Sequence, residues 1–111
     1  MAFSRWDVVS VNYPFIEGDT AKHRPGLIVS TDRLNATHGL YAVAMITTAR
    51  AGIRKDDIPI SDLNKAGLPV PCVVRTARLT TLNEAMIGRR AGTLTMKDRN
   101  AVAGLLRAHF G

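Results

Sequence analysis

Apolar and polar positions alternate over several short segments of the chain, which predicts a protein built mainly of β-strands. In residues 7–13, DVVSVNY, Val9 and Val11 fall on one side, and Val8 and Ser10 on the other. This is the period of a half-buried strand. Short β-branched or apolar runs between glycines and prolines continue the pattern. We expect strands at residues 7–13, 26–31, 41–47, 57–60, 72–82 and 87–94.

From Thr95 the period changes to that of a helix. Residues 95–110 place five side chains on one face, and Thr95 followed by Asp98 predicts an N-cap. The expected face consists of Val102, Leu105, Leu106, His109 and Phe110. Gly104 lowers helix propensity by up to about 1 kcal/mol, so we expect it to mark a close contact.

The segments between the strands predict little further regular structure. Residues 32–39, DRLNATHG, indicate a loop or a single helical turn, and residues 61–71 are interrupted by Gly67, Pro69 and Pro71. Short strands closed by one C-terminal helix predict a mainly β (α+β) fold, a small β-barrel with short accessory helical turns. At 111 residues, the whole chain 1–111 is expected to form a single domain.

The charge balance indicates a polyanionic partner. Lys and Arg outnumber Asp and Glu by 15 to 9, which gives a net charge of +6. Nucleic acid is the first partner to consider, and solubility is the simpler explanation for the same charge. The positions of the basic residues must decide between the two.

Cysteine and histidine usage narrows the class of protein. Cys72 is the single cysteine, so no internal disulfide forms, and a reducing cytoplasm is the expected compartment. The N-terminal residues lack the features of an export signal, and no apolar run reaches the ~20 residues of a membrane span. His23, His38 and His109 are scattered without zinc-ligand spacing. We therefore expect chemistry without a metal or cofactor, and no membrane association.

Arg24-Pro25 is the first candidate for chemistry. Proline favours an extended backbone at the preceding residue and fixes its own φ, so the guanidinium of Arg24 leaves the strand end in a defined direction. A planar, permanently charged fork is suited to phosphate oxygens. The alternative is an ion pair with Glu17 or Asp19 in the same loop.

Thr47, Thr48 and Arg75 are further candidates for anion binding. The two threonines end an apolar strand, where a hydroxyl either donates to a phosphate oxygen or satisfies a neighbouring backbone group. Arg75 lies inside a strand, so its charge must reach solvent or a partner. Basic residues next to these positions are expected to grip flanking phosphates, or else to form a solvated rim. They are Lys22, Arg50, Arg54 and Lys55.

The order of these segments resembles the MazF/PemK/Kid family of toxins from toxin–antitoxin systems. The resemblance covers nearly the whole chain, and its most specific parts are HRPGLIVS, YAVAMITT and the final AGTLTMKDRNAVAGLLRAHFG. It implies an SH3-like barrel with added helices and a homodimer that cleaves single-stranded RNA, often mRNA, at short motifs. It also implies a cognate antitoxin, and the basic charge makes an acidic, extended antitoxin segment sensible.

Carried over by position, the resemblance implies that Arg24 is the catalytic arginine and that Thr47 holds the scissile phosphate. His23, Thr48 and Arg75 are accessory candidates. The Kid-like branch has an aspartate two residues after the equivalent of Arg75, where this chain has Ala77. The general base is therefore not assigned.

One further departure concerns the start of the chain. Trp6 stands where the family usually has glycine, which affects packing more than chemistry. The competing hypothesis for the whole protein is a non-catalytic SH3-like basic module that binds nucleic acid or an acidic peptide.

Overall fold

The fold was analysed in a computed structural model, which describes residues 2–12 and 24–111. The strands are β1 (Asp7–Val11), β2 (Arg24–Ile28), β3 (Leu40–Thr48), β4 (Asp57–Pro59), β5 (Cys72–Asn83) and β6 (Ile87–Thr93). The helices are α1 (Asp32–His38), α2 (Leu63–Ala66) and α3 (Met96–Phe110), with short 3₁₀ turns at Ala49–Ala51 and Glu84–Met86. The six expected strands are therefore confirmed.

The strands form one antiparallel sheet in the order β4-β5-β3-β2-β1-β6. The mainly β class with a C-terminal helix is confirmed, but the expected barrel is not closed. Among the described residues, β4 is three residues long and pairs only with β5, while β6 pairs only with β1, so the sheet remains open. The strand at 57–60 is indeed an edge strand.

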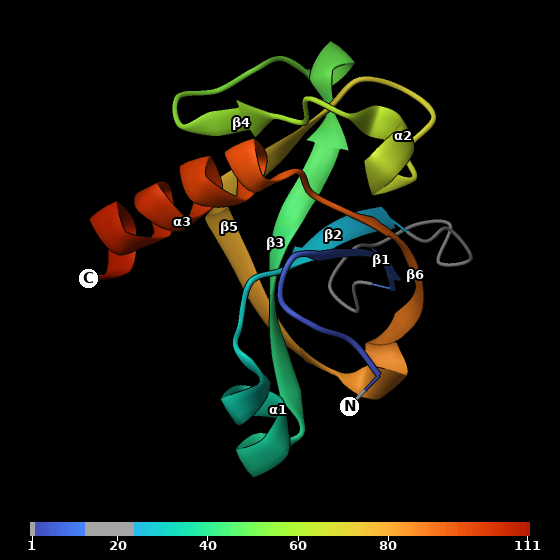
Figure 1. The fold of residues 1–111 in the computed structure, drawn as a ribbon, viewed down its shortest axis with the longest axis vertical. Coiled ribbons are helices and arrows are strands. Elements are labelled where there is room, and N and C mark those ends of the chain that lie inside the picture. Colours follow the sequence, from blue (N-terminus) through green and yellow to red (C-terminus); the bar gives the residue numbers. More distant parts are fainter. Residues whose placement is uncertain (1, 13–23) are drawn as a thin grey trace.

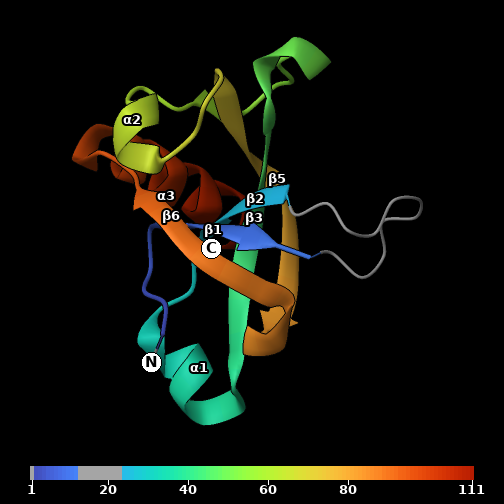
Figure 2. The same ribbon diagram turned by 90° about the vertical axis from the view of Figure 1, so that its right-hand side faces the viewer.

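Two apolar clusters cover the two faces of the sheet. The first contains Val8 and lies under the helices, whose Ala66 and Val102 are fully buried in it. The second contains Val9 and Val11, so the alternation expected in β1 is confirmed. Figures 1 and 2 show α2 and α3 on the same side of the sheet. Both faces are covered because the sheet bends around the second cluster while the helices close the first.

Helix α3 begins as the sequence predicts. The Thr95 side chain accepts a hydrogen bond from the Asp98 N–H at 3.2 Å, and buried Asp98 accepts from both the N–H and the hydroxyl of Ser61. The expected apolar face is only partly right, because Phe110 is 64% exposed. Gly104 does not mark a close contact within the chain, since a Cβ there would meet nothing within 4 Å.

The segment 32–39 is more ordered than the sequence predicts. Residues Asp32–His38 form a seven-residue helix that ends at Gly39, which adopts the left-handed conformation (φ 70°) of a helix C-cap. In Figure 1, α1 lies at the opposite end of β3 from β4 and α2. No helix among the described residues is long and apolar enough to span a membrane.

Candidate active site

Arg24 and Thr47 lie on adjacent antiparallel strands at the same end of the sheet. Strand β2 pairs with β3 in the register Gly26 opposite Met45 and Leu27 opposite Ala44. The same register, continued toward the strand ends, places Arg24 across from Thr47, so both side chains project from one face. Arg24 is exposed and Thr47 is half-buried.

Thr48 is directed differently from Thr47, because successive side chains of a strand point to opposite faces. Thr48 is exposed at the end of β3 and lines a pocket of about 290 Å³. Arg24 and Pro25 line the same pocket, which extends between β1, β6 and the segment before β5. Thr47 is not among its lining residues. Thr48 therefore lies at the pocket and Thr47 on the opposite face of β3, and Arg24 lies next to both.

Arg75 has a partner inside the protein. Its Nε donates to Asp57 Oδ1 at 3.2 Å, and its Nη2 donates to Asp57 Oδ2 at 3.0 Å and to the Gly52 carbonyl oxygen at 3.2 Å. The side chains are 9% and 1% exposed. Arg75 lies across from Met45 on β3, two positions before Thr47, so it supports the site from beneath.

The ion pair shifts the protonation of both partners. Burial by itself raises the pKa of Asp57, but hydrogen bonds from the Arg75 guanidinium and the Arg54 N–H, together with both positive charges, bring it below its usual value. The hydrogen bonds that Arg75 donates to Asp57 raise the pKa of Arg75, against the opposing effect of burial. Both groups are therefore charged at neutral pH.

The basic loop consists of residues 49–56, between β3 and β4. Arg50, Arg54 and Lys55 are exposed on it. The Asp57 carboxylate also accepts from the Arg54 N–H at 2.7 Å, which closes the turn before β4. In Figures 1 and 2 this loop follows the end of β3 that carries Thr47 and Thr48. Arg50 thus lies next to the end of β3, whereas Arg54 and Lys55 lie beside β4, which β5 and β3 separate from β2 and Arg24.

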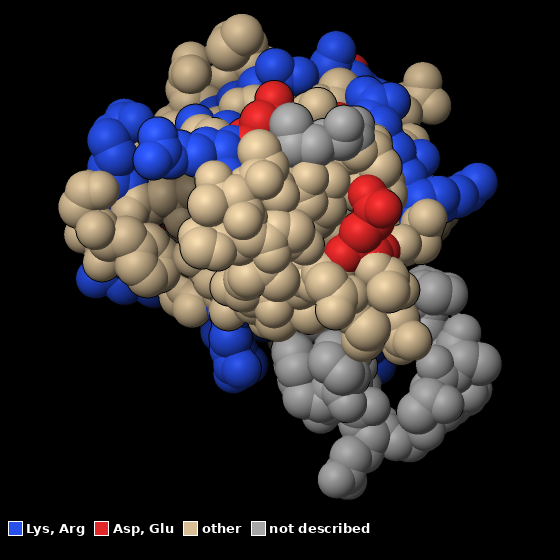
Figure 3. Space-filling view, turned by 90° about the horizontal axis from the view of Figure 1, so that it is seen from below, with Lys and Arg blue, Asp and Glu red and all other residues tan. Residues whose placement is uncertain are grey.

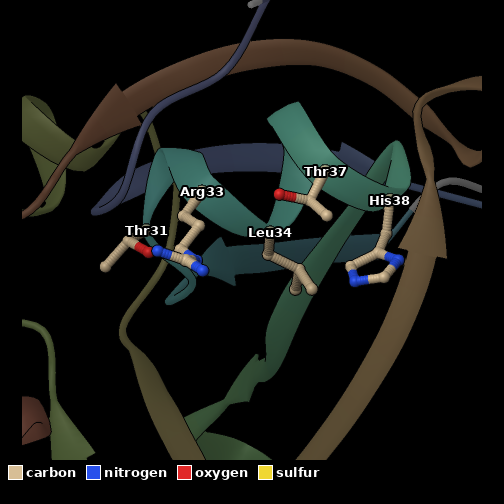
Figure 4. Close-up of a pocket in the computed structure, with 5 residues that line it drawn as sticks. All are labelled: Thr31, Arg33, Leu34, Thr37 and His38. Carbon is tan, nitrogen blue, oxygen red and sulfur yellow. The ribbon is translucent and has the colours of Figure 1, made fainter.

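Of the two histidines that the structure describes, one contacts the basic loop and the other lies on α1. His23 and Lys22 lie outside the described residues. His109 contacts Asp56 at 3.3 Å and ties the end of α3 to the basic loop. His38 lies on α1 and lines a second pocket of about 300 Å³, where Figure 4 shows Thr31 beside Arg33 and Leu34 between them and His38. This second pocket is at the far end of β3 from Thr47.

Figure 3 views the molecule from the end that carries α1 and shows mostly uncharged residues in the centre of that end, with Lys and Arg around its margin. In the described part of the chain, no group of three or more His, Cys, Asp or Glu residues is arranged to hold a metal ion. The residues that meet at the rim are hydroxyls and guanidiniums, which suit anionic oxygens.

Two residues of the site were not predicted from the sequence. Asp57 gave no signal beyond its place before a short strand, although it holds both Arg75 and the basic loop. Arg89 lies in a glycine-containing strand that carries two adjacent arginines, and it lines the pocket beside Arg24. Nothing in the local pattern separates Arg89 from Arg90, which pairs with Asp7 at 2.9 Å.

Comparisons with known proteins agree with the resemblance. Residues 4–110 match the family model described as PemK-like, MazF-like toxin of type II toxin–antitoxin system. A comparison with curated proteins found no match.

Solved structures share the fold. MazF from Deinococcus radiodurans superposes with a TM-score of 0.77 at 19% identity, covering 100% of this chain and 98% of that one. The Mycobacterium tuberculosis toxin MazF-mt6 has a TM-score of 0.72 at 24% identity, covering 94% and 95%. An endoribonuclease in complex with its cognate antitoxin, from a mycobacterial species, has a TM-score of 0.71 at 21% identity, covering 97% and 93%.

Proposed function

The chain belongs to the PemK-like, MazF-like family of type II toxin–antitoxin toxins, and from this membership we propose that it is a metal-independent endoribonuclease. Its substrate is single-stranded RNA, including mRNA, cut at short sequence motifs. The observation that carries the proposal is the position of Arg24 across from Thr47, with exposed Arg50 three residues after Thr47. An open rim accepts a single strand, whereas a duplex would demand a broader surface.

In the proposed reaction the 2′-oxygen of a ribose attacks the adjacent phosphorus. The new bond closes a 2′,3′-cyclic phosphate, the bond to the 5′-oxygen breaks, and the leaving strand keeps a 5′-hydroxyl. One proton leaves the 2′-hydroxyl and one is delivered to the 5′-oxygen. The attacking atom belongs to the substrate, so the protein supplies charge stabilisation, alignment and proton transfer.

Arg24 stabilises the negative charge that builds up on the phosphorane oxygens. Its guanidinium stays protonated, so it is a poor base, and proton donation to the leaving oxygen is a secondary role. Its exposed side chain follows directly from a strand end fixed by Pro25. One preorganised donor of this kind contributes about 10²–10³ in rate.

Thr47 aligns the phosphate by donating its hydroxyl to a non-bridging oxygen. Its backbone is fixed between β2 and β5, where it lies across from Val73, so the hydroxyl is held on a rigid strand. Arg75 acts indirectly, because its contacts with Asp57 and Gly52 hold the basic loop. His23 is the accessory candidate for proton transfer, since an unperturbed imidazole titrates near pH 6.5.

The proposed partners follow from the family and from the charge. An antitoxin with an acidic, extended segment would neutralise Arg24, Arg50 and Arg54 by occupying the RNA rim. A solved relative is described as an endoribonuclease bound to its cognate antitoxin, which supports such a complex here. We also propose a homodimer. Met96 and Phe110, which are 65% and 64% exposed at the two ends of α3, supply apolar surface for association.

The function is tested by incubating the purified chain with a long mixed-sequence RNA in EDTA and mapping the cuts and their end chemistry. The expected result is cutting at a short recurring motif, with 5′-hydroxyl and cyclic phosphate ends. Cuts that require an added divalent metal would contradict the metal-free reaction. Tight RNA binding without any cut would instead favour the non-catalytic basic module.

A further inference from the structure

The pocket beside Arg24 has apolar walls and a cationic mouth. Two of its lining residues belong to the protein core: Val9 is fully buried and Cys72 is 5% exposed. Leu68 and Val70, from the segment between α2 and β5, form one wall. Arg24, Thr48 and Arg89 provide its polar groups. Its volume of about 290 Å³ is close to that of the smallest small-molecule sites, about 300 Å³.

Two irregularities of β6 direct side chains toward this pocket. Val8 lies across from Gly92 and Val9 from Arg90, so Ala91 is an extra residue on β6. Val9 and Val11 then face Arg90 and Ile87, which leaves a second extra residue between them. Bulges of this kind turn side chains out of the regular alternation and are frequent next to active sites. Arg89 and Ala91 both line the pocket.

The position of Arg89 is fixed by its backbone. Its N–H donates to the Ser10 hydroxyl at 3.1 Å, and Ser10 also lines the pocket. A Cβ at the preceding Gly88 would lie 2.5 Å from that hydroxyl oxygen, so a side chain there would displace the Ser10 hydroxyl. The side chain of Arg89 therefore extends from a fixed backbone position on the pocket wall.

The opposite wall is also held in place. Gly67 has φ 74°, and a Cβ there would collide with the Ala91 carbonyl oxygen. A Cβ at Gly92 would collide with the Lys65 carbonyl oxygen. These contacts pack α2 directly on β6, so the Leu68–Val70 segment is held against the bulged strand. A preformed pocket binds its ligand with less loss of conformational freedom.

Two guanidiniums stand at the mouth of the pocket. Within residues 2–12 and 24–111, no carboxylate lies within 4.0 Å of the Arg24 or Arg89 guanidinium. The neighbouring Arg90 is instead paired with Asp7. Two permanently charged, planar groups beside an apolar cavity suit a nucleotide, because its phosphate is anionic while its base has apolar faces and a polar edge.

We propose that this pocket receives the unstacked RNA base next to the scissile phosphate, and that Arg89 reads the edge of that base. The proposal rests on the endoribonuclease function, because it places the phosphate of the same nucleotide at Arg24. The chain has few aromatic residues for stacking, so Leu68 and Val70 would contact the base instead. Arg89 is then a specificity residue and is not required for the chemical step.

The test measures binding of short RNAs that cannot be cut. Fully 2′-O-methylated oligomers of U, C and A are titrated against the wild type, Arg89→Ala, Arg89→Lys and Arg107→Ala. Arg107 is exposed on α3, so its variant controls for the loss of one charge. We expect the wild type and Arg107→Ala to prefer the same base. Both Arg89 variants should lose that preference by about tenfold, because lysine keeps the charge but not the planar fork.

Three results would overturn the proposal. Equal weakening for all bases by Arg89→Ala, with Arg89→Lys like the wild type, would mean that Arg89 contacts a phosphate. Unchanged base preference in both Arg89 variants would remove Arg89 from recognition. Variants that bind all RNAs normally but lose affinity for the antitoxin would assign the pocket to the protein partner. The methylated RNAs lack a free 2′-hydroxyl, so they report binding separately from cleavage. If the protein binds them base-selectively but does not cut ordinary RNA, the result contradicts the proposed endoribonuclease function and leaves the proposed base pocket standing.

Discussion

The Arg75 guanidinium holds the Asp57 carboxylate at two points, with distances of 3.2 and 3.0 Å, and links β5 to the loop that carries Arg54 and Lys55. The same carboxylate accepts from the Arg54 N–H, and Arg75 also reaches the Gly52 carbonyl oxygen. The pair therefore anchors the middle of the basic loop, at Gly52 and Arg54, to β4 and β5. Arg75, which the family resemblance gives as an accessory candidate at the site, therefore positions the loop that carries other cations.

Asp57→Asn should destabilise the fold strongly. Asparagine keeps the size of the side chain but leaves Arg75 as a buried charge without its counterion, which costs about 3–5 kcal/mol. The free energy of unfolding is measured in urea at neutral pH. Asp62→Asn is the matched control, because Asp62 is an exposed N-cap of α2 and asparagine caps equally well. Equal stabilities for the two variants would show that the ion pair contributes nothing.

The same pair predicts a pH dependence of stability. The pKa of Asp57 is lower in the folded state than in the unfolded chain, so its contribution is complete above about pH 4 and is lost as pH falls through the lowered value. The stability difference between wild type and Asp57→Asn should therefore shrink in acid. Unfolding curves at pH 6 and pH 3 measure it, and a difference that stays constant contradicts the assignment.

Trp6 is held in the left-handed region with φ 77°, where a residue with a Cβ is strained by about 1–2 kcal/mol. Its N–H donates to the Ile28 carbonyl oxygen and its carbonyl accepts from the Thr93 hydroxyl, so the backbone cannot relax. Arg5 stacks over the indole at 4.5 Å. This geometry gives a physical reason for the glycine that the family usually has here.

Trp6→Gly should be more stable than Trp6→Ala by about 1 kcal/mol, which corresponds to about 4–8 °C in melting temperature. Both variants lose the indole, and only glycine relieves the backbone. Thermal unfolding of the pair measures the strain without the packing contribution. Equal melting temperatures would mean that the backbone at this position relaxes when the side chain is removed.

Two glycines predict opposite effects of alanine. Gly104→Ala should stabilise α3 by about 0.5–1 kcal/mol, because the position is helical and the new methyl meets no atom within 4 Å. Gly67→Ala should destabilise the protein by at least about 2 kcal/mol, because it combines a φ of 74° with a collision against the Ala91 backbone. Chemical denaturation compares them, and a stabilising Gly67→Ala would contradict the tight packing of α2 on β6.

Most of the fold could be predicted from the sequence because local patterns of apolar and polar residues specify its strands and its last helix. The alternation of Val8 with Val9 separates two cores, and Thr95 with Asp98 starts α3. Residues 32–38 were expected to form a loop or a single helical turn and not a seven-residue helix, because none of the helix's residues is buried and no apolar period marks it. The open sheet was missed because closure depends on whether β4 and β6 meet, which no local pattern specifies.

Site residues could be predicted from the sequence where the residue type and its place in a strand identify them. They could not be predicted where their role depends on a contact between two distant segments. Arg24-Pro25 and Thr47 stand out by composition and position. The partner of Arg75 is 18 residues away, and the role of Arg89 depends on bulges against β1 that leave no mark in the sequence. The exposure of Phe110 follows from the length of α3, whose last turn carries its apolar side chain to solvent.

The central claim is that Arg24 and Thr47 act on one scissile phosphate. Single-turnover cleavage of one RNA in EDTA by Arg24→Ala and Thr47→Ala tests it most directly, with Arg107→Ala and Thr37→Ala as controls for the same changes at exposed sites on α3 and α1. We predict a rate loss of about 10²–10³ for Arg24→Ala, a smaller loss for Thr47→Ala, and wild-type rates for both controls. Wild-type rates in Arg24→Ala and Thr47→Ala would contradict the account.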